Sequence, residues 1–289
     1  AASATVPGVN GGNPGLANEV ANSFTYGVVL QPRFVPGLTI SVDYTNIKIK
    51  QPIASLTVAQ IATACFDNET FNTADPANGN DFCSQIRRYT AADGGTAVNG
   101  GSRAGQVIND PQNPGVSSGF VNGNRVTFEG IQGTIDYRQP FGLGVPGDID
   151  ISGSLQYVRR RVNDITGVAP VRIDGTLNDP EFQGQLNIRY IGERFGISGS
   201  FNYIGEQLFS RVTRTPDIRE IDQLNDFIII NPSFYVDAND RFRLTFSVTN
   251  LTNRNGQKYF GVVIPASYVS GLGGDLIGRS FRITASGKF

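Results

Sequence analysis

Apolar and polar residues alternate one by one in segments of about ten residues, and this pattern recurs along the whole chain. In the last segment, Phe281 and Ile283 alternate with Arg282 and Thr284. A period of two is typical of β-strands whose two faces meet different surroundings. Nine strands are therefore predicted, over residues 20–32, 37–50, 118–138, 148–162, 181–191, 195–212, 226–237, 241–252 and 276–289.

Three stretches depart from simple alternation. Around Gly130 the apolar positions change parity, which predicts a bulge. The run Phe227–Ile230 is continuously apolar and is soon followed by Pro232. Residues 56–65 have helical character and predict a short helix within a long loop.

The connections between the predicted strands alternate strictly in length. Outer-membrane barrels have short periplasmic turns and long extracellular loops, whereas a soluble sandwich has no reason to segregate loop lengths. The fold class predicted is therefore all-β, an antiparallel transmembrane β-barrel segment, with Phe289 on the periplasmic side. The short connections are 31–36, 139–147, 192–194 and 238–240, and the long ones are 51–117, 163–180, 213–225 and 253–275.

Aromatic residues give a second indication, because they gather near both ends of the predicted strands. Two aromatic bands are expected where a barrel crosses the two membrane interfaces, although β-proteins are rich in aromatics in general. The periplasmic band is predicted to hold Tyr137, Phe141, Tyr190, Phe195, Tyr235, Phe242 and Phe289, and the outer band Phe24, Tyr44, Tyr157, Phe182 and Phe227.

Composition excludes several classes of function. Charged residues make up 17% and the net charge is −1, so the chain has no basic surface typical of nucleic-acid binding. The sequence contains no histidine, which removes His-based catalytic triads, most zinc enzymes and haem ligation by histidine. An enzyme is therefore not expected, and neither is a cofactor. An outer-membrane hydrolase with a carboxylate pair ranks last among the alternatives.

The two cysteines, Cys65 and Cys83, lie in a stretch rich in Gly, Asn and Asp. A local disulfide is predicted, worth about 3 kcal/mol for a loop of this size. It indicates an oxidising compartment. Oxygen-bearing side chains in the same stretch do not follow the EF-hand spacing, so turn formation is favoured over Ca²⁺ binding. They are Asp67, Glu69, Asp75, Asn78, Asn80 and Asp81.

Four segments resemble a known family when they are taken in order. They are Asn13–Glu19 (NPGLANE), Ser23–Gly27 (SFTYG), Pro36–Tyr44 (PGLTISVDY) and Val248–Asn253 (VTNLTN). In these segments, and in its terminal Phe289, the sequence resembles the C-terminal part of the barrel of a TonB-dependent receptor. The resemblance covers nearly the whole chain.

The resemblance implies a transporter in the outer membrane of a Gram-negative bacterium. Such receptors import a scarce solute (a siderophore, a vitamin or an oligosaccharide) with energy delivered by TonB. The plug domain, through which TonB acts, has no counterpart in residues 1–289. Receptors of this kind close with about 22 strands, so the remaining strands are expected on an N-terminal portion or, less favoured, on another copy. The family's barrel-assembly signal maps onto Phe281, Ile283 and Phe289.

Two further sets of residues are candidates for contacts. Arg159, Arg160 and Arg161 are suited either to lipopolysaccharide phosphates or to a solvated rim, and the sequence leaves both open. A different class of function, a secreted or surface-exposed adhesin or filament subunit paired between copies, is the main alternative to transport. Polar residues expected to face the lumen, as possible solute contacts, are Asp43, Gln132, Asp150, Gln185, Arg189, Asn202 and Arg243.

Overall fold

The computed structural model describes residues 8–67, 71–72, 74, 79–80, 82–95, 101–141, 146–168, 170–211, 223–254, 258–259, 267–268 and 278–287. The chain divides into two compact units. The first comprises Ala1–Asn22, Lys48–Thr127 and Val162–Val171, and the second comprises Ser23–Ile47, Phe128–Arg161 and Arg172–Phe289. Each unit is described by itself.

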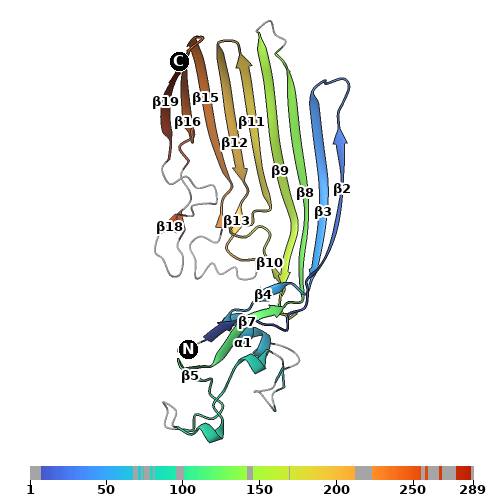
Figure 1. Ribbon diagram of the computed structural model, residues 1–289, viewed down its shortest axis with the longest axis vertical. Helices are drawn as coiled ribbons and strands as arrows, with labels where there is room; N and C mark the ends of the chain where they lie inside the picture. The colour runs from blue at the N-terminus through green and yellow to red at the C-terminus, as the bar shows by residue number, and fades with distance from the viewer. Residues whose placement is uncertain are drawn as a thin grey trace. The chain divides into compact units, whose positions relative to one another are not determined.

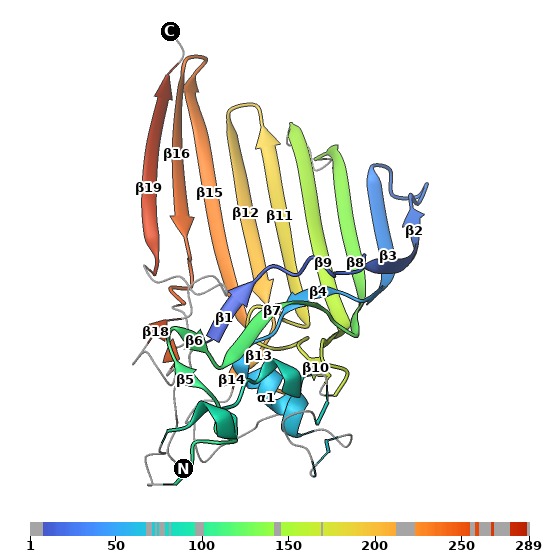
Figure 2. The same cartoon turned by 60° about the horizontal axis from the view of Figure 1, so that its bottom comes forward.

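The second unit is built on one large antiparallel sheet, which Figures 1 and 2 show as a row of long neighbouring strands. Nine strands follow one another as β2-β3-β8-β9-β11-β12-β15-β16-β19, and the short β10 (Val171–Arg172) pairs with β9. Their bounds are β2 Val20–Leu30, β3 Leu38–Lys50, β8 Arg125–Pro140, β9 Gly147–Asp164, β11 Phe182–Gly192, β12 Phe195–Ile204, β15 Phe227–Asn239, β16 Phe242–Thr249 and β19 Ser280–Gly287.

The register of the sheet separates apolar from polar side chains. Leu186 of β11 lies opposite Gly153 of β9 and Phe201 of β12. Its neighbour Gln185 lies opposite Ser154 and Asn202. Because residues directly opposite each other in an antiparallel pair point to the same side, one face of the sheet is apolar and the other is polar. The alternation predicted from the sequence is confirmed, and these surfaces are called the apolar face and the polar face below.

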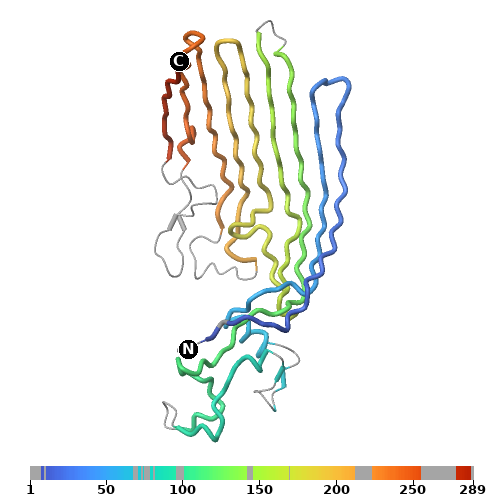
Figure 3. The backbone as a smooth tube through the Cα atoms, viewed as in Figure 1, coloured from blue at the N-terminus to red at the C-terminus, as the bar shows by residue number. Residues whose placement is uncertain are grey.

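The predicted alternation of short and long connections is also confirmed. The connections from β2 to β3, β8 to β9, β11 to β12 and β15 to β16 are short. The backbone trace in Figure 3 shows, for example, β11 and β12 joined by a tight turn. Gly37, in the first of these turns, has φ +77°, and a Cβ atom there would lie 2.2 Å from the Arg138 carbonyl oxygen. Only glycine suits this position, because it tolerates both the left-handed backbone and the close approach.

The predicted strand 118–138 is wrong, because the chain forms two strands there. Residues Val116–Asn122 form β7, which belongs to a separate three-stranded sheet with β1 (Gly8–Gly11) and β4 (Ile53–Ser55). The break falls at Gly123, whose N–H donates to the Pro52 carbonyl oxygen (2.7 Å). The predicted strand 195–212 is also too long, since β12 ends at Ile204 and is followed by β13 (Gln207–Leu208).

The first unit has a small core around the disulfide between Cys65 and Cys83, whose Cα atoms are 4.8 Å apart. The predicted disulfide is confirmed. The predicted helix is also confirmed as α1 (Val58–Phe66), which Thr57 and Gln60 cap reciprocally. Core residues are Leu56, Ile61, Cys65, Cys83, Ile86 and Val116.

Several short elements complete the fold. Within the described ranges, no helix is long and apolar enough to cross a membrane. Two short 3-10 helices span Cys83–Gln85 and Ala91–Asp93, and the remaining short strands are β5 (Asn109–Asp110), β6 (Asn113–Pro114), β14 (Gln223–Leu224), β17 (Lys258–Tyr259) and β18 (Ser267–Tyr268).

Strand β15 contains a proline inside the sheet. Pro232 lies opposite Gly199 of β12 and has no N–H to donate to a neighbouring strand. One residue earlier, the Asn231 side chain accepts a hydrogen bond (2.8 Å) from the N–H of Asn250, just beyond the end of β16. A side chain therefore supplies a contact between β15 and the residue after β16 close to Pro232.

Candidate functional site

All seven residues predicted to face the lumen lie on the polar face. Asp43 has the parity of Ser41 in β3, whose hydroxyl contacts Thr134 of β8 (2.7 Å) on this face. The other six have polar neighbours on adjoining strands. Gln185 and Asn202 lie directly opposite each other. Arg189 forms an ion pair with Asp150 (2.9 Å) across β11 and β9. The structure does not gather all seven into one site, but distributes them along the sheet. The residues concerned are Gln132, Asp150, Gln185, Arg189, Asn202 and Arg243.

A hollow of about 300 Å³ on this face is lined by side-chain amides. Gln132, Gln185 and Asn202 line it, together with Gln156 and Gln183. The Gln183 side-chain amide nitrogen donates to the side-chain oxygen Oε1 of Gln156 (2.8 Å). Each side-chain amide offers both donors and acceptors. This hollow is therefore suited to neutral or weakly charged solutes that present several oxygen or nitrogen atoms.

A second hollow of about 360 Å³ is lined by residues of four neighbouring strands, mostly hydroxyl and amide groups. Asn231 donates to Ser200 (3.2 Å), and Arg189 supplies the positive charge beside Asp150. A solute moving along this part of the face would meet one paired charge among neutral hydrogen-bonding groups. The lining residues are Ser152, Asn187, Arg189, Ser198, Gly199, Ser200 and Asn231.

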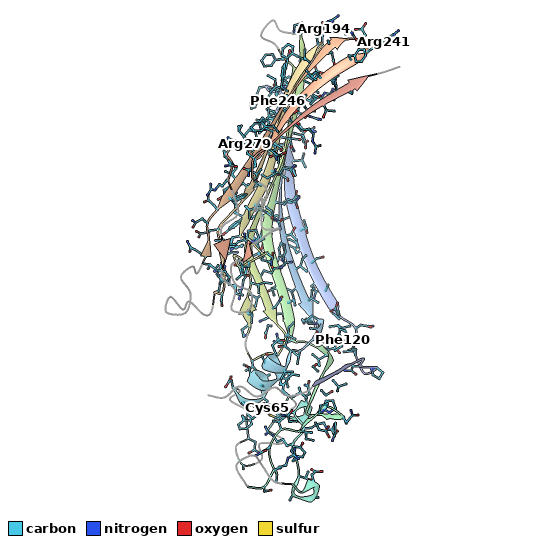
Figure 4. All side chains as sticks on the ribbon, turned by 90° about the vertical axis from the view of Figure 1, so that its left-hand side faces the viewer. Cys65, Phe120, Arg194, Arg241, Phe246 and Arg279 are labelled. Carbon is cyan, nitrogen blue, oxygen red and sulfur yellow. A yellow bond between two sulfur atoms is a disulfide. The ribbon has the colours of Figure 1, made fainter. Side chains whose placement is uncertain are left out.

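Arg243 belongs to a third and more strongly charged hollow of about 520 Å³. Its guanidinium forms two hydrogen bonds to Asp237 (2.7 and 2.8 Å) and lies 3.9 Å from the centre of the Tyr235 ring. Arg194 and Arg241 also line this hollow, and Figure 4 shows both at one end of the sheet. The geometry gives a fixed, paired charge rather than a free cation.

The prediction that Tyr235 belongs to the periplasmic aromatic band is wrong. A Cβ atom at Gly196 would lie 2.2 Å from the Tyr235 ring, and Arg243 stacks on the same ring. Tyr235 therefore lies on the polar face, because its position in β15 has the parity of Asp237. By contrast, Tyr190 contacts Phe141 and Phe195 (5.2 and 5.3 Å between ring centres).

Sequence reasoning missed a buried carboxylate in the segment that follows β9. Asp174 is 0% exposed and forms ion pairs with Arg172 (2.7 Å) and Arg211 (3.1 Å). The backbone N–H of Arg161 also donates to it (2.6 Å). Burial acts to raise the pKa of Asp174, but the hydrogen bonds from Arg172 and Arg161 and the nearby positive charges outweigh burial and hold this pKa below its usual value. No sequence motif pointed to this residue.

The three consecutive arginines do not form one patch. Alternation along β9 places Arg160 on the opposite face from Arg159 and Arg161. Arg159 contacts Glu129, which also accepts a hydrogen bond from the Tyr44 hydroxyl (2.6 Å). These three side chains, called the Arg159 cluster, sit on the apolar face. Arg161 is paired instead with Asp179.

Comparison with known proteins decides the family. The sequence matches the family described as TonB dependent receptor-like, beta-barrel, over residues 2–251. The chain belongs to the TonB-dependent receptor β-barrel family. Members of this family are transporters of the outer membrane rather than enzymes. A comparison with curated protein sequences found no match.

Solved structures of TonB-dependent receptors share the fold. A mutant of the ferric enterobactin receptor of Pseudomonas aeruginosa, in complex with enterobactin, is 17% identical, with a TM-score of 0.57 over 97% of this chain and 33% of that one. The siderophore receptor PirA of Acinetobacter baumannii is 11% identical (TM-score 0.53; 94% and 32% covered). The pyoverdine receptor FpvA of P. aeruginosa, bound to pyoverdine, is 12% identical (TM-score 0.52; 95% and 30% covered). The chain thus spans about a third of these receptors.

The last strand of this receptor barrel segment, β19, exposes two large apolar side chains, Phe281 (63%) and Ile283 (70%). The Phe281 ring stacks on Phe246 of β16, whose place in the sheet Figure 4 marks (6.2 Å between ring centres). Both residues of the predicted assembly signal therefore lie on a strand that is paired on one side only among the described residues. Phe289, the third, lies outside the described residues.

The oxygen-rich stretch near the disulfide of this receptor barrel segment is only partly described. Glu69, Asp75, Asn78 and Asp81 lie outside the described residues. The Asn80 side chain donates to the Ala64 and Cys65 carbonyl oxygens (3.2 and 3.1 Å) and accepts from the backbone of the next turn. Asn80 thus forms a turn, as favoured from the sequence. Among the residues that the structure describes, no group of three potential ligands is placed to hold a metal ion.

Proposed function

We propose that this chain forms part of the wall of a receptor that imports a scarce solute with energy delivered by TonB. The observation that carries the proposal is the nine-stranded sheet with one apolar and one polar face, together with membership of the family. Of the three solute classes expected, a siderophore is favoured, because two of the similar solved receptors are in complex with enterobactin and pyoverdine. A vitamin or an oligosaccharide would use the same scaffold.

In this proposal the apolar face contacts lipid and the polar face lines the lumen. The location is the outer membrane of a Gram-negative bacterium, where lipopolysaccharide surrounds the barrel. The short turns lie in the periplasm, and the long connections, including residues 51–117 with their disulfide, lie outside the cell. An oxidising environment outside the cytoplasm suits the disulfide.

A complete receptor also needs parts beyond residues 1–289. Strands β2 and β19 pair on one side only among the described residues, and unpaired edges are costly in lipid. We propose that the remaining strands, and the plug that contacts TonB, belong to a longer receptor chain. The barrel-assembly machinery would read the terminal strand through Phe281, Ile283 and Phe289.

Within the lumen, the amide-lined hollow is the proposed contact surface for the solute. Its residues Gln132, Gln185 and Asn202 offer donors and acceptors without a net charge. Asp43, Asp150, Arg189 and Arg243 complete the set expected to line the passage. Asp150 and Arg189 neutralise each other, so neither would trap a charged solute strongly.

The test is uptake by cells that carry the full-length receptor. Deletion of the gene should abolish uptake of one labelled ferric siderophore from a panel, and inactivation of TonB should have the same effect. Uptake that persists without TonB would overturn the proposal. For the lumen surface, the double change Gln185→Ala and Asn202→Ala should lower uptake several-fold. The adjacent change Leu186→Ala, on the apolar face, is the matched control and should leave uptake unchanged.

A further inference from the structure

A row of four polar side chains crosses the polar face from strand to strand. Asp43 of β3, Gln132 of β8, Gln156 of β9 and Gln183 of β11 come from neighbouring strands, which Figure 2 shows side by side. The three glutamines line the amide-lined hollow together. Gln183 lies directly opposite Gln156, and its side-chain amide donates to the Gln156 side-chain oxygen (2.8 Å). These four residues are called the polar row below.

Contacts on both sides fix the place of Asp43 at the end of this row. The Ser41 hydroxyl contacts the Thr134 hydroxyl of β8 (2.7 Å). Asp43 is two residues further along β3 and Gln132 is two residues earlier in β8, so the two lie at one level of the antiparallel sheet. On the other side, a Cβ atom at Gly27 of β2 would lie 2.1 Å from an Asp43 carboxylate oxygen. The carboxylate therefore lies over a residue without a side chain.

Asp43 is the charged member of the polar row, and its charge is not neutralised by a paired cation. Among the residues that the structure describes, it takes part in no ion pair, whereas Asp150 on the same face is paired with Arg189 (2.9 Å). The nearest residues of the same parity on β3, Ser41 and Thr45, carry hydroxyl groups. Because Asp43 is only half-buried, its negative charge acts on whatever approaches the row.

A cation with the parity of the polar face lies further out along β9. Arg160 is four residues beyond Gln156, which is about 14 Å at 3.4 Å per residue. That distance exceeds the Debye length of about 8 Å at physiological ionic strength, so the charge of Arg160 is largely screened at the row. Asp43 and Gln132 are separated by one strand spacing of about 4.8 Å. The carboxylate therefore dominates the electrostatic potential at the polar row.

From this arrangement we infer that the polar row accepts uncharged, oxygen-rich solutes and rejects anions, and that Asp43 is the residue that rejects them. Side-chain amides exchange hydrogen bonds with hydroxyl, carbonyl or hydroxamate oxygens without any need for charge. An ionised carboxylate has no N–H or O–H to donate, so an anion meets only a like charge there. Repulsion of the wrong solute is one of the two ways to achieve specificity. The inference rests on the proposed function, because it requires the polar face to line a passage for solute.

Charge separates the solutes that the proposed function allows. Hydroxamate groups can balance the charge of a ferric ion, whereas catecholate groups leave the ferric complex anionic. Among siderophores the inference therefore selects the uncharged ferric hydroxamates. Similarity to the enterobactin and pyoverdine receptors, at 17% and 12% identity, extends to the fold and not to the charge of the solute.

The test uses cells in which the full-length receptor is the one route for ferric siderophores. Two labelled probes are supplied, an uncharged ferric tris-hydroxamate and an anionic ferric tris-catecholate, and the wild-type receptor should take up the uncharged probe in preference. Asp43→Asn should raise the ratio of anionic to uncharged uptake several-fold, the effect of removing a like charge at about 5 Å in water. Asp43→Glu keeps the charge and should keep the ratio low.

Asp136→Asn is the matched control for the loss of a carboxylate from the polar face. Asp136 is exposed and shares the parity of Gln132 on β8, but it lies four residues nearer the short turn, about 14 Å away. Its replacement should leave the uptake ratio unchanged. Arg160→Gln should also leave the ratio unchanged. A ratio that responds to Arg160→Gln and not to Asp43→Asn would overturn the inference.

Each variant should retain heat-modifiable migration on a gel, which reports a folded barrel. A wild-type preference for the anionic probe, or an unchanged ratio in Asp43→Asn, would overturn the inference while TonB-dependent uptake leaves the proposed function intact. If neither ferric probe is taken up, a neutral oligosaccharide and its carboxylated counterpart replace them, with the same expected ratios. Absence of TonB-dependent uptake of all four probes would refute the proposed function, and the inference with it.

Discussion

Asp174 and Arg211 are 37 residues apart in the sequence and meet in an ion pair of 3.1 Å. Asp174 follows β10, and Arg211 follows β13, so the pair joins the connection after β9 to the connection after β12. Arg211 also contacts Glu181, the residue before β11. Two long connections of the barrel wall are therefore joined by this ion pair as well as by backbone hydrogen bonds of Leu208 to Gly175 and Leu177.

Replacement of Asp174 by Asn should loosen both connections without unfolding the sheet. The carboxylate is fully buried, and its loss removes the nearer counter-charge of Arg172 and leaves Glu181 as the remaining carboxylate beside both arginines. The local cost should be about 2 kcal/mol, since both arginine side chains are partly exposed. Hydrogen exchange should show faster exchange in residues 170–181 and 205–211 only. Asp179→Asn, at a more exposed ion pair, should have a smaller effect.

The same carboxylate predicts a dependence on pH. Because the folded state lowers the pKa of Asp174 below its usual value of 3.8, the folded state binds fewer protons than the unfolded chain near that pH. Its stabilisation is complete above the usual pKa and is lost as the pH falls through the lowered value. The protection of residues 170–181 from hydrogen exchange, relative to the unfolded chain at the same pH, should therefore fall as the pH is lowered below the usual pKa of an aspartate. An identical loss of protection in Asp174→Asn would show that another group is responsible.

Two adjacent residues of β12 test which face contacts lipid. Phe201 lies on the apolar face and Asn202 on the polar face. In the full-length receptor, Phe201→Arg should disfavour the inserted barrel by about 2–4 kcal/mol if it lies near the middle of the membrane. Asn202→Arg should be tolerated, because it enters an aqueous lumen. Yield of the heat-modifiable form measures both, and equal tolerance of the two changes would contradict the assignment of the faces.

Replacement of Asn250, which follows β16, should destabilise the folded barrel for two reasons that can be tested separately. Its φ of 55° lies in the left-handed region, and its buried side chain exchanges two hydrogen bonds with the Arg254 backbone (both 2.9 Å). Asn250→Ala should lose both the preferred conformation and the hydrogen bonds, about 3 kcal/mol in total. Asn250→Gly should lose roughly half as much, because glycine accepts this φ. Thermal midpoints of heat modification compare the two, and equal losses would mean that the backbone conformation contributes nothing.

The sheet was predictable from the sequence because each strand's alternation reflects two different environments. Leu186 and Gln185 indicate opposite faces without knowledge of their neighbours. The division of residues 118–138 was not predictable in this way, because Gly123 turns the chain through backbone hydrogen bonds to residues distant in sequence. The network around Asp174 was missed for the same reason: its partners come together only through tertiary structure.

The candidate site was predictable in kind but not in arrangement. Alternation identified Gln185 and Asn202 as members of one face, and the register places them opposite each other. Sequence reasoning grouped Arg159 with Arg160, yet alternation separates them and Glu129 holds only Arg159. It also placed Tyr235 in the periplasmic aromatic band, whereas its parity in β15 puts it on the polar face, where Arg243 stacks on its ring.

Pro232 affects the unfolded chain as well as the folded sheet. The preceding run Phe227–Ile230 is uncharged, β-branched and aromatic, which is the composition of segments that stack with their own copies into fibrils. Before a barrel strand is inserted into the outer membrane, it is unpaired in an aqueous compartment. There such an apolar run favours aggregation. A proline two positions later removes a donor from any such stack. In the folded sheet the missing N–H lies on the side of β16, where the Asn231 side chain accepts a hydrogen bond from the Asn250 N–H (2.8 Å). Strand β15 therefore continues through the proline without a break.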